Sequence, residues 1–458
     1  MIILRYLCCI IIGLCSVKKS FSKPPNFIVI FTDDQGFEDL GCFGSPKIKT
    51  PHLDQLAADG RKFTSFYSAN SVCSPSRASL MTGCYPVRVS IPGVLFPRHD
   101  IGLNPDEITI ADLLKTKSYA TACIGKWHIG HKPKFLPTSQ GFDSYYGIPY
   151  SNDMTIDPEA KLAENINLRE GFTLDRIRNE KPKKNLVPLM RNEEVIEYPC
   201  DQTTLTKRYT EEAVKFIEEN KKRPFFLYLP HTMPHIPLFA SENFKGKSER
   251  GPYGDTIEEI DWSVGEIMKA LRKNNLDEKT LVVYTSDNGP WKLKGGRGGS
   301  ANPLRGYKFQ TYEGGMRVPC VMHWKGKIPP GSSCDEIAAT IDLLPTIAGL
   351  SGVELPNDRT IDGKNIWPLI SGKEGAKTPH EIYFFYKGNS LESARQGKWK
   401  LRRSGKKTQS IELYDLASDI SESNNLAQEN EALINEIIQK RNSFDEKLKN
   451  AQRPAGKL

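Results

Sequence analysis

The chain has 458 residues, of which 38% are hydrophobic and 26% are charged, and its mean hydropathy is −0.47. Its 63 Lys and Arg residues outnumber its 55 Asp and Glu residues and give a formal net charge of +8. This composition excludes a collagen, a coiled coil, a disordered chain and a multispanning membrane protein. We therefore expect a soluble globular protein of two to four domains, or one large α/β unit with a smaller addition.

Residues 1–22 are predicted to be a signal peptide. A short basic start is followed by an apolar run over residues 6–17, which is too short to cross a bilayer comfortably. Small residues before Lys23 fit a cleavage site, and the alternative is an uncleaved anchor. The sequence therefore predicts an exported protein, periplasmic, secreted or lysosome-like, without a stable membrane span.

Removal of this segment leaves seven of the ten cysteines. An odd number of cysteines in an oxidising compartment indicates that one of them has a role other than pairing. The sequence does not decide whether the remaining six form disulfides, because six cysteines allow many connectivities. These six are Cys42, Cys84, Cys123, Cys200, Cys320 and Cys334.

Four apolar runs, rich in β-branched and aromatic residues, are predicted to be strands buried on both faces of one sheet. Helical patterns lie between them. Strands that alternate with helices predict an α/β fold with a large, mostly parallel sheet sandwiched by helices. The predicted strands are Phe27–Phe31, Tyr119–Ile124, Phe225–Leu229 and Leu281–Thr285, and the predicted helices are Ile110–Lys117, Leu205–Glu219 and Ile257–Leu271.

Each predicted strand runs into a cluster of polar residues. One such loop alone is more often an ordinary turn, because Asp, Asn and Gly are common turn residues. Ligands of parallel sheets bind beyond the carboxyl ends of the strands, so four clusters together predict a functional site there. The clusters are Thr32–Gly36, Gly125–His128, Pro230–His235 and Ser286–Gly289.

The sequence changes character at residue 379. Short strand-like runs at Ile382–Tyr386, Trp399–Arg402 and Ile411–Tyr414 precede an amphipathic stretch at Glu429–Lys449. We predict a catalytic domain over residues 23–378 and a small C-terminal subdomain over 379–458, made of an antiparallel sheet and a helix. Residues 157–199 are charged and weakly periodic and predict an insertion or lid near the site. The sequence contains no basic stripe with interleaved aromatic residues, so it gives no indication of nucleic-acid binding.

The string Cys73-Ser74-Pro75-Ser76-Arg77, followed by Leu80-Met81-Thr82-Gly83, is the most specific motif in the chain. It resembles the signature of the sulfatase family within the alkaline-phosphatase superfamily. In that family the cysteine is oxidised after synthesis to formylglycine, and a maturation enzyme reads the Cys-x-Pro-x-Arg pattern. This modification would account for the odd cysteine. The resemblance covers nearly the whole mature chain, and it extends to Thr32–Gly36, Gly125–His128, Ser286–Gly289, Lys308 with Tyr312–Arg317, and Glu412–Leu416.

The resemblance implies a metal centre and a covalent mechanism. Asp33, Asp34, Asp287 and Asn288, with residue 73, would bind the metal. Oxygen ligands suit Ca²⁺ or Mg²⁺ and suit Zn²⁺ poorly. The hydrated aldehyde at residue 73 would attack sulfur through one hydroxyl, while its second hydroxyl would later expel the product. Asp287 is also a candidate to take the proton of the attacking hydroxyl. The alternative for Cys73 is a buried thiol or a thiolate at a helix start.

The other residue types that the resemblance implies for catalysis are also present. Lys126 and Lys308 would contact the sulfate oxygens, and Arg77 would orient the diol. Family resemblance assigns His128 to the proton removal that releases sulfate, and His235 to the leaving oxygen. His231 competes with His235 for this role. A loop serine, Ser151, corresponds to a substrate-contacting serine of relatives.

These residues predict an arylsulfatase-type hydrolase of sulfate monoesters. A sulfated carbohydrate is the expected natural substrate, and small aryl sulfates would serve as reporters. One alternative is a phosphatase or phosphodiesterase of the same superfamily, although Asn288 stands where such enzymes carry a histidine. The other is an inactive protein that binds sulfated glycans, if Cys73 is never converted by a formylglycine-generating enzyme.

Overall fold

The computed structural model describes residues 24–292, 296–404 and 410–458, and the predicted signal peptide lies outside them. An 11-stranded sheet forms the centre of the described chain, in the order β13-β2-β12-β11-β1-β10-β5-β6-β8-β9-β7. One of its central strands, β1, pairs in parallel with both β10 and β11, and β10 pairs in parallel with β5. These four are the predicted strands, with bounds β1 (Asn26–Thr32), β5 (Ala120–Ile124), β10 (Phe225–Pro230) and β11 (Thr280–Ser286).

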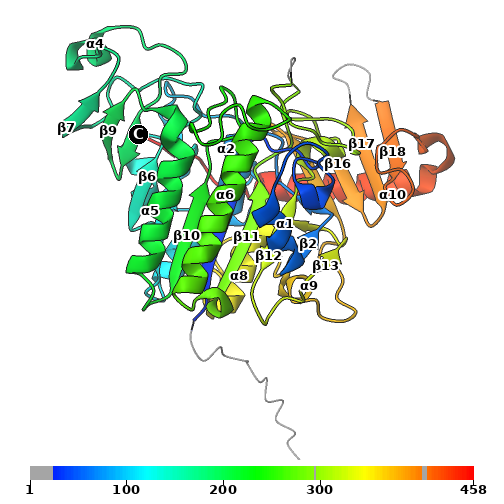
Figure 1. Cartoon of the computed structure of the whole chain (residues 1–458). Coiled ribbons are helices and arrows are strands. Elements are labelled where there is room, and N and C mark those ends of the chain that lie inside the picture. The colour runs from blue at the N-terminus through cyan, green and yellow to red at the C-terminus, as the bar shows by residue number, and fades with distance from the viewer. Residues whose placement is uncertain (1–23, 293–295, 405–409) are drawn as a thin grey trace, which may run out of the picture.

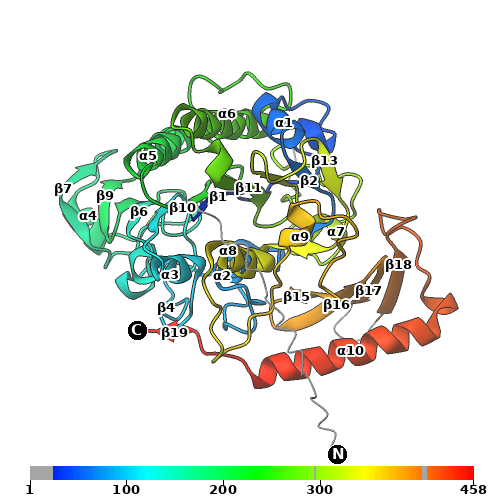
Figure 2. The same ribbon diagram turned by 90° about the horizontal axis from the view of Figure 1, so that it is seen from below.

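Helices cover both faces of the sheet (Figures 1 and 2). Alternate side chains of β1 enter two separate cores, as the period of a strand requires. Ile28 and Ile30 pack with the helices of one face, and Val29 and Phe31 pack with those of the other. The predicted α/β sandwich is therefore confirmed. The first face carries α1 (Pro51–Ala58), α5 (Leu205–Glu219) and α6 (Pro252–Lys273), and the second carries α2 (Cys73–Thr82), α3 (Ile110–Lys115) and α8 (Leu343–Ser351).

Residues 157–199 extend the main sheet instead of forming a separate lid. Their strands β9 and β7 make the edge beyond β6 and β8 (Figure 1). Edge strands with exposed polar side chains lack a clear apolar period, which explains why the sequence pattern did not predict them. The bounds are β6 (Ser144–Gly147), β7 (Leu162–Leu168), α4 (Leu174–Asn179), β8 (Leu189–Arg191) and β9 (Glu194–Tyr198), and the opposite edge has β2 (Arg61–Phe63), β12 (Cys320–His323) and β13 (Ser332–Cys334).

The C-terminal region contains a four-stranded antiparallel sheet with one long helix, as predicted. Strand β16 was not predicted, because few of its residues are apolar. The boundary at residue 379 stays a prediction. The elements are β15 (Tyr383–Lys387), β16 (Ser390–Gln396), β17 (Trp399–Ser404), β18 (Ser410–Asp415) and α10 (Glu431–Asn450).

The end of the chain returns to the large sheet's side of the molecule. After α10, β19 (Gly456–Lys457) pairs with β4 (Ile101–Gly102), as Figure 2 shows near the label C. Arg453 reinforces this return, because its guanidinium binds the Glu107 carboxylate at 2.7 Å. The remaining short strands and α-helices are β3 (Phe66–Tyr67), β14 (Ala338–Ala339), α7 (Glu313–Met316) and α9 (Trp367–Ile370).

All seven cysteines in the described part of the chain are free thiols. Cys320 of β12 and Cys334 of β13 both lie opposite Phe63 of β2, on its two sides in the sheet. Strand β2 therefore separates them. The described fold depends on its hydrophobic cores and hydrogen bonds, with no disulfide among these seven residues.

In the described residues, every helix is too short or too polar to span a bilayer. The predicted export of the protein stays a prediction.

Candidate active site

Two pairs of candidate metal ligands meet at the carboxyl ends of β1 and β11. Because these strands pair in parallel register, Asp33 and Asp34 lie beside Asp287 and Asn288. The Asp34 amide donates to Asp287 Oδ1 at 3.1 Å, and Asn288 Nδ2 donates to Asp34 Oδ1 at 2.7 Å. All four side chains are buried. Asp34 has a φ of 61°, which non-glycine residues adopt mostly where the surrounding structure imposes it.

Helix α2 brings the signature cysteine to these carboxylates. Cys73 is its first residue and Arg77 follows one turn later, so both side chains lie on the same face of the helix. Cys73 Sγ lies 3.4 Å from Asp33 Oδ1. Arg77 donates from Nε and Nη2 to Asp287 Oδ2 at 3.1 and 2.8 Å, and from Nη1 to the Lys126 carbonyl at 2.8 Å. The arginine thereby joins the loops that follow β11 and β5.

The two predicted lysines also reach the centre. Lys126 Nζ binds the Asp33 carboxylate. Lys308 Nζ donates to Asp34 Oδ2 at 2.8 Å and lies 3.7 Å from Cys73 Sγ. Both lysines are buried. The sulfur of Cys73 therefore stands among ammonium groups and carboxylates supplied by four separate segments of the chain.

His235 is the histidine that faces this centre. Its Nε2 lies 3.6 Å from Asp34 Oδ2, and its Nδ1 lies 3.1 Å from Asn152 Oδ1. The Ser151 hydroxyl lies 3.4 Å from both His235 Nδ1 and Lys126 Nζ. Ser151 is therefore within reach of two of the predicted site residues.

The competing histidine points elsewhere. His231 Nε2 lies 3.4 Å from the hydroxyl of Ser263 on α6, and burial lowers the pKa of His231 to about 3. His128 Nε2 lies 3.0 Å from the Leu95 carbonyl, and its Nδ1 is buried without a partner among the described residues. Burial, with the nearby Lys126 charge, holds the pKa of His128 well below its ordinary value. His128 is therefore a neutral imidazole with one free nitrogen.

The donor atoms at the centre fit a hard divalent cation. One atom each of Asp33, Asp34, Cys73 and His235 lie within 4.8 Å of one another. Asn288 Oδ1 is buried without a hydrogen-bond partner among the described residues, which is costly for an amide oxygen. A cation held by this amide oxygen and the neighbouring carboxylates would satisfy it, and oxygen donors are those that Ca²⁺ and Mg²⁺ prefer.

The charges of the site act on one another. Although burial alone raises the pKa of the Asp33 carboxyl, the Lys126 ammonium holds that pKa well below its ordinary value. Burial and the Asp33 charge raise the pKa of Asp287 to about 7, against the effect of Arg77. Burial, followed by the Asp33 carboxylate, also raises the pKa of the Cys73 thiol. The unmodified thiol is thus neutral near pH 7 and does not fit the thiolate alternative.

Sequence reasoning missed two groups around the site. Asn152 positions His235, and its Nδ2 donates to Gln202 Oε1 at 3.1 Å and to the Pro237 carbonyl at 2.9 Å. In the sequence, the only indication of a role for Asn152 was its position next to Ser151. The second group consists of the aromatic side chains of Trp291 and Phe309, whose rings lie near Lys308. Their contacts form only when distant loops meet, so no local sequence pattern indicates them.

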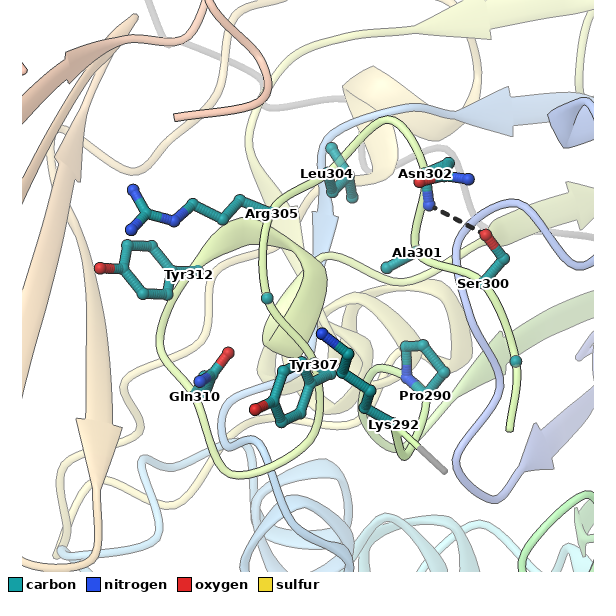
Figure 3. Close-up of a pocket in the computed structure, with 12 residues that line it drawn as sticks. Pro290, Lys292, Ser300, Ala301, Asn302, Leu304, Arg305, Tyr307, Gln310 and Tyr312 are labelled. Carbon is teal, nitrogen blue, oxygen red and sulfur yellow. Dashed lines mark hydrogen bonds between the residues drawn. The ribbon is translucent and has the colours of Figure 1, made fainter. Parts of the chain in front are cut away.

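A cavity of about 450 Å³ is lined by residues on both sides of Lys308 in the sequence, among them Tyr307 and Gln310 (Figure 3). Lys292 extends over the ring of Tyr307, and Arg305 lies over that of Tyr312. None of the predicted site residues lines this cavity. The lining residues are Pro290, Lys292, Gly299, Ser300, Ala301, Asn302, Leu304, Arg305, Gly306, Tyr307, Gln310 and Tyr312.

Carboxylates and cations around one buried residue, at the carboxyl ends of a parallel sheet, are typical of an enzyme that hydrolyses an anionic ester. The family model described as Sulfatase matches residues 25–353, and the one described as N-sulphoglucosamine sulphohydrolase, C-terminal, matches residues 307–452. The chain belongs to the sulfatase family, and it is a sulfatase with an alkaline-phosphatase-like fold.

Individual relatives agree with this assignment. The chain is 41% identical over 395 residues to arylsulfatase A of Homo sapiens, covering 83% of this chain and 75% of that protein. It is 38% identical over 390 residues to N-acetylgalactosamine-6-sulfatase of Canis lupus familiaris, covering 82% and 71%. Among solved structures, Ps i-CgsB in complex with k-i-k-neocarrahexaose superposes with a TM-score of 0.80 at 31% identity and covers 92% of this chain and 93% of that one.

Proposed function

We propose that this sulfatase hydrolyses sulfate monoesters of a sulfated carbohydrate, with residue 73 converted to formylglycine and Ca²⁺ bound beside it. The observation that carries the proposal is the position of Cys73, whose sulfur lies 3.4 Å from Asp33 and 3.7 Å from Lys308. A nucleophile at this point lies within reach of both anion-binding and proton-accepting groups. The net reaction consumes one water and yields an alcohol and sulfate.

Three cations of the chain would bind and orient the reacting groups. Lys126 and Lys308 would donate to the sulfate oxygens and stabilise the negative charge that builds up in the transition state. Arg77 is fixed by its contacts with Asp287 and would hold the hydroxyls of residue 73 in place. Ser151, 3.4 Å from Lys126 Nζ, would contact the substrate beside them.

Three other groups would move protons. Asp287, whose pKa is raised to about 7 by burial and the Asp33 charge, would accept the proton of the attacking hydroxyl. His235, 3.4 Å from Ser151, would donate to the leaving oxygen. His128, with its unpartnered Nδ1, would take the proton of the second hydroxyl when sulfate departs.

Asp33, Asp34, Asp287 and Asn288, with residue 73, would hold the cation. When bound, Ca²⁺ would neutralise charge on the sulfate and on residue 73. The buried and unpartnered Asn288 Oδ1 supports this ligand set. Mg²⁺ has the same preference for oxygen but demands stricter octahedral geometry.

Removal of the metal tests this ligand set. We expect chelation with EGTA to lower kcat/KM for an aryl sulfate by about 100-fold or more, and added Ca²⁺ to restore it. The melting temperature is expected to fall as well, since a ligand that binds only the native state stabilises it. Mg²⁺ added alone is the matched comparison. Full activity in protein shown by elemental analysis to be metal-free would contradict the proposal.

A carbohydrate substrate is supported by two neighbours. One relative is named for a sulfatase of N-acetylgalactosamine, and one solved neighbour was crystallised with a neocarrahexaose. Both cover more than four-fifths of this chain. The likeness to arylsulfatase A, another relative, makes small aryl sulfates suitable reporters.

We also propose that a maturation enzyme converts Cys73 before the chain folds. Cys73 is 2% exposed, and Ser74, Ser76 and Arg77 are fully buried. An enzyme that reads this string needs access to it, which the folded protein does not give. Export with removal of residues 1–22 would bring the unfolded chain into a secretory compartment, and the amino terminus of the mature protein is then expected to be Lys23.

Peptide mass spectrometry tests the central proposal. The protein is produced in cells that co-express a formylglycine-generating enzyme, and the tryptic peptide that contains Cys73 is compared with the same peptide from cells without it. Conversion is expected to lower its mass by about 18 Da and to be accompanied by hydrolysis of 4-nitrophenyl sulfate. An unmodified thiol in protein that still hydrolyses the ester would show that formylglycine is not the nucleophile.

A pair of histidine variants tests which imidazole acts on the leaving group. His235→Ala is expected to lower kcat for a sulfated sugar by about 10²- to 10⁴-fold, the usual loss for a general acid. His231→Leu is the matched control and is expected to retain kcat within about threefold, since His231 contacts α6 instead of the site. Equal losses in both variants would contradict the assignment of His235.

A further inference from the structure

Two aromatic side chains, Trp291 and Phe309, extend in a row from the reacting centre to the surface, and we call them the aromatic wall. Its inner part is Trp291, whose ring centroid lies 4.7 Å from Lys308 Nζ and 5.7 Å from the ring of His235. Its outer part is Phe309, 5.8 Å from Trp291 in an edge-to-face arrangement. Trp291 is half-buried, whereas Phe309 is 42% exposed.

The backbone fixes this wall in place. The Lys308 amide donates to the Pro290 carbonyl at 3.0 Å, which holds the two segments side by side. The Phe309 amide donates to the Ser71 carbonyl at 3.1 Å, two residues before Cys73. Lys292 and Tyr307, which neighbour Trp291 and Lys308 in the sequence, line the cavity of about 450 Å³ that Figure 3 shows. Trp291, Lys308 and Phe309 do not line that cavity. Because Trp291 contacts His235 and Lys308, the wall belongs to the active-site side.

Phe309 occupies its place against two ordinary preferences. Its φ of 73° is in the left-handed region, which is strained for a bulky residue. It is also one of few large apolar side chains that the described chain exposes. Strained residues cluster at ligand sites, and exposed apolar surface often marks a binding site. Both features indicate that this ring serves a ligand.

The position of Trp291 defines which part of a ligand would meet it. Its ring flanks both Lys308, which would bind the sulfate, and His235, which would protonate the leaving oxygen. The group attached to that oxygen must therefore pass along the ring. A pyranose has an apolar C–H face that packs on the electron-rich face of an aromatic ring.

We propose that Trp291 and Phe309 form the binding platform for the sugar ring of the leaving group. This inference rests on the proposed hydrolysis of sulfated carbohydrates and names the residues that select such a leaving group. Trp291 stacks on the ring that carries the sulfate, and Phe309 covers the unit that follows it toward the solvent. The cation–aromatic contact with Lys308 also holds the platform beside the sulfate site.

Binding to an inactive protein tests the platform separately from catalysis. In a Cys73→Ala background, the Kd is measured for sulfated disaccharides from carrageenan, chondroitin and heparin, and for ethyl sulfate, which lacks a ring. Trp291→Ala is expected to raise the ratio of the disaccharide Kd to the ethyl sulfate Kd about tenfold, and Phe309→Gly by a smaller factor. Trp291→Phe keeps an aromatic face and is expected to restore most of the affinity.

Trp262 supplies the matched control, since it is also half-buried but packs against Phe244. Neither residue is close in sequence to Trp291 or Phe309. Trp262→Phe is expected to leave both dissociation constants unchanged. An unchanged ratio in Trp291→Ala, or an equal loss for both ligands, would overturn the platform. So would a Cys73→Ala parent that binds no disaccharide more tightly than ethyl sulfate. Failure of the proposed function looks different, since the converted wild-type protein would then hydrolyse no sulfate ester.

Discussion

Cys73→Ala is expected to lower kcat for 4-nitrophenyl sulfate by at least about 10⁴-fold, the scale of loss when a covalent nucleophile is removed. Alanine supplies no atom for attack on sulfur, while Lys126 and Lys308 remain to bind the ester. The free energy of unfolding is expected to change little, because the thiol makes only weak contacts with Asp33 and Lys308. The measurement is a steady-state assay beside urea denaturation of the same preparation.

Cys73→Ser separates the two hydroxyls of the proposed nucleophile. A single hydroxyl can take the sulfuryl group from the ester but has no neighbour on the same carbon to expel it. We therefore expect one turnover and a stable adduct about 80 Da heavier, visible by intact mass spectrometry. Cys42→Ser is the control, because Cys42 lies outside the site and is only partly buried. Sustained turnover by either Cys73 variant would contradict the mechanism.

Lys400→Met is expected to lower the free energy of unfolding by about 3–5 kcal/mol, the usual cost of breaking a buried ion pair. Lys400 Nζ on β17 lies 2.7 Å from Glu313 Oε1 and 3.0 Å from Glu422 Oε1, and all three side chains are buried. Its removal leaves Glu422 without this cation, and leaves Glu313 with its ion pair to Arg317 and a hydrogen bond from the Tyr67 hydroxyl.

The loss of unfolding free energy in Lys400→Met is expected to depend on pH. Burial raises the pKa of Glu422 even with Lys400 present, and loss of the lysine raises it further. A carboxyl whose pKa is higher in the folded than in the unfolded protein makes the folded protein less stable as the pH rises above the unfolded value, about 4.5 for Glu422. The deficit should therefore be larger at pH 8 than at pH 5 in urea titrations. Lys398→Met is the control, since its half-exposed pair with Asp415 is worth about 1 kcal/mol or less. Equal effects of the two substitutions would contradict the argument.

The same cluster links the C-terminal sheet to the active site. Glu313 begins α7, five residues after Lys308, so Lys400 anchors the segment that carries a proposed sulfate-binding lysine. Thr311 adds a hydrogen bond of 2.8 Å to Glu392 of β16. A Lys400→Met protein that remains folded is therefore also expected to bind sulfate esters more weakly.

Much of this architecture could be read from local patterns. The four buried strands are continuous apolar runs, and α5 has the predicted bounds Leu205–Glu219, because a strong 3.6-residue period depends only on neighbouring residues. The acidic loops at the strand ends were recognised for the same reason. The edge strands of residues 157–199 were missed, since their polar faces carry no period that distinguishes them from a loop.

The sequence by itself determined the sulfatase family, the α/β fold and the chemical types at the site, because the signature from Cys73 to Gly83 and the strand-end clusters are contiguous. Only the tertiary structure showed that His235 faces the carboxylates while His231 contacts α6, left the described cysteines unpaired, and placed Trp291 beside Phe309. These features depend on contacts between residues far apart in the chain, such as Lys400 with Glu313 at a separation of 87. Residue type and local spacing carry no record of such contacts, which form only when the sheet brings its loops together.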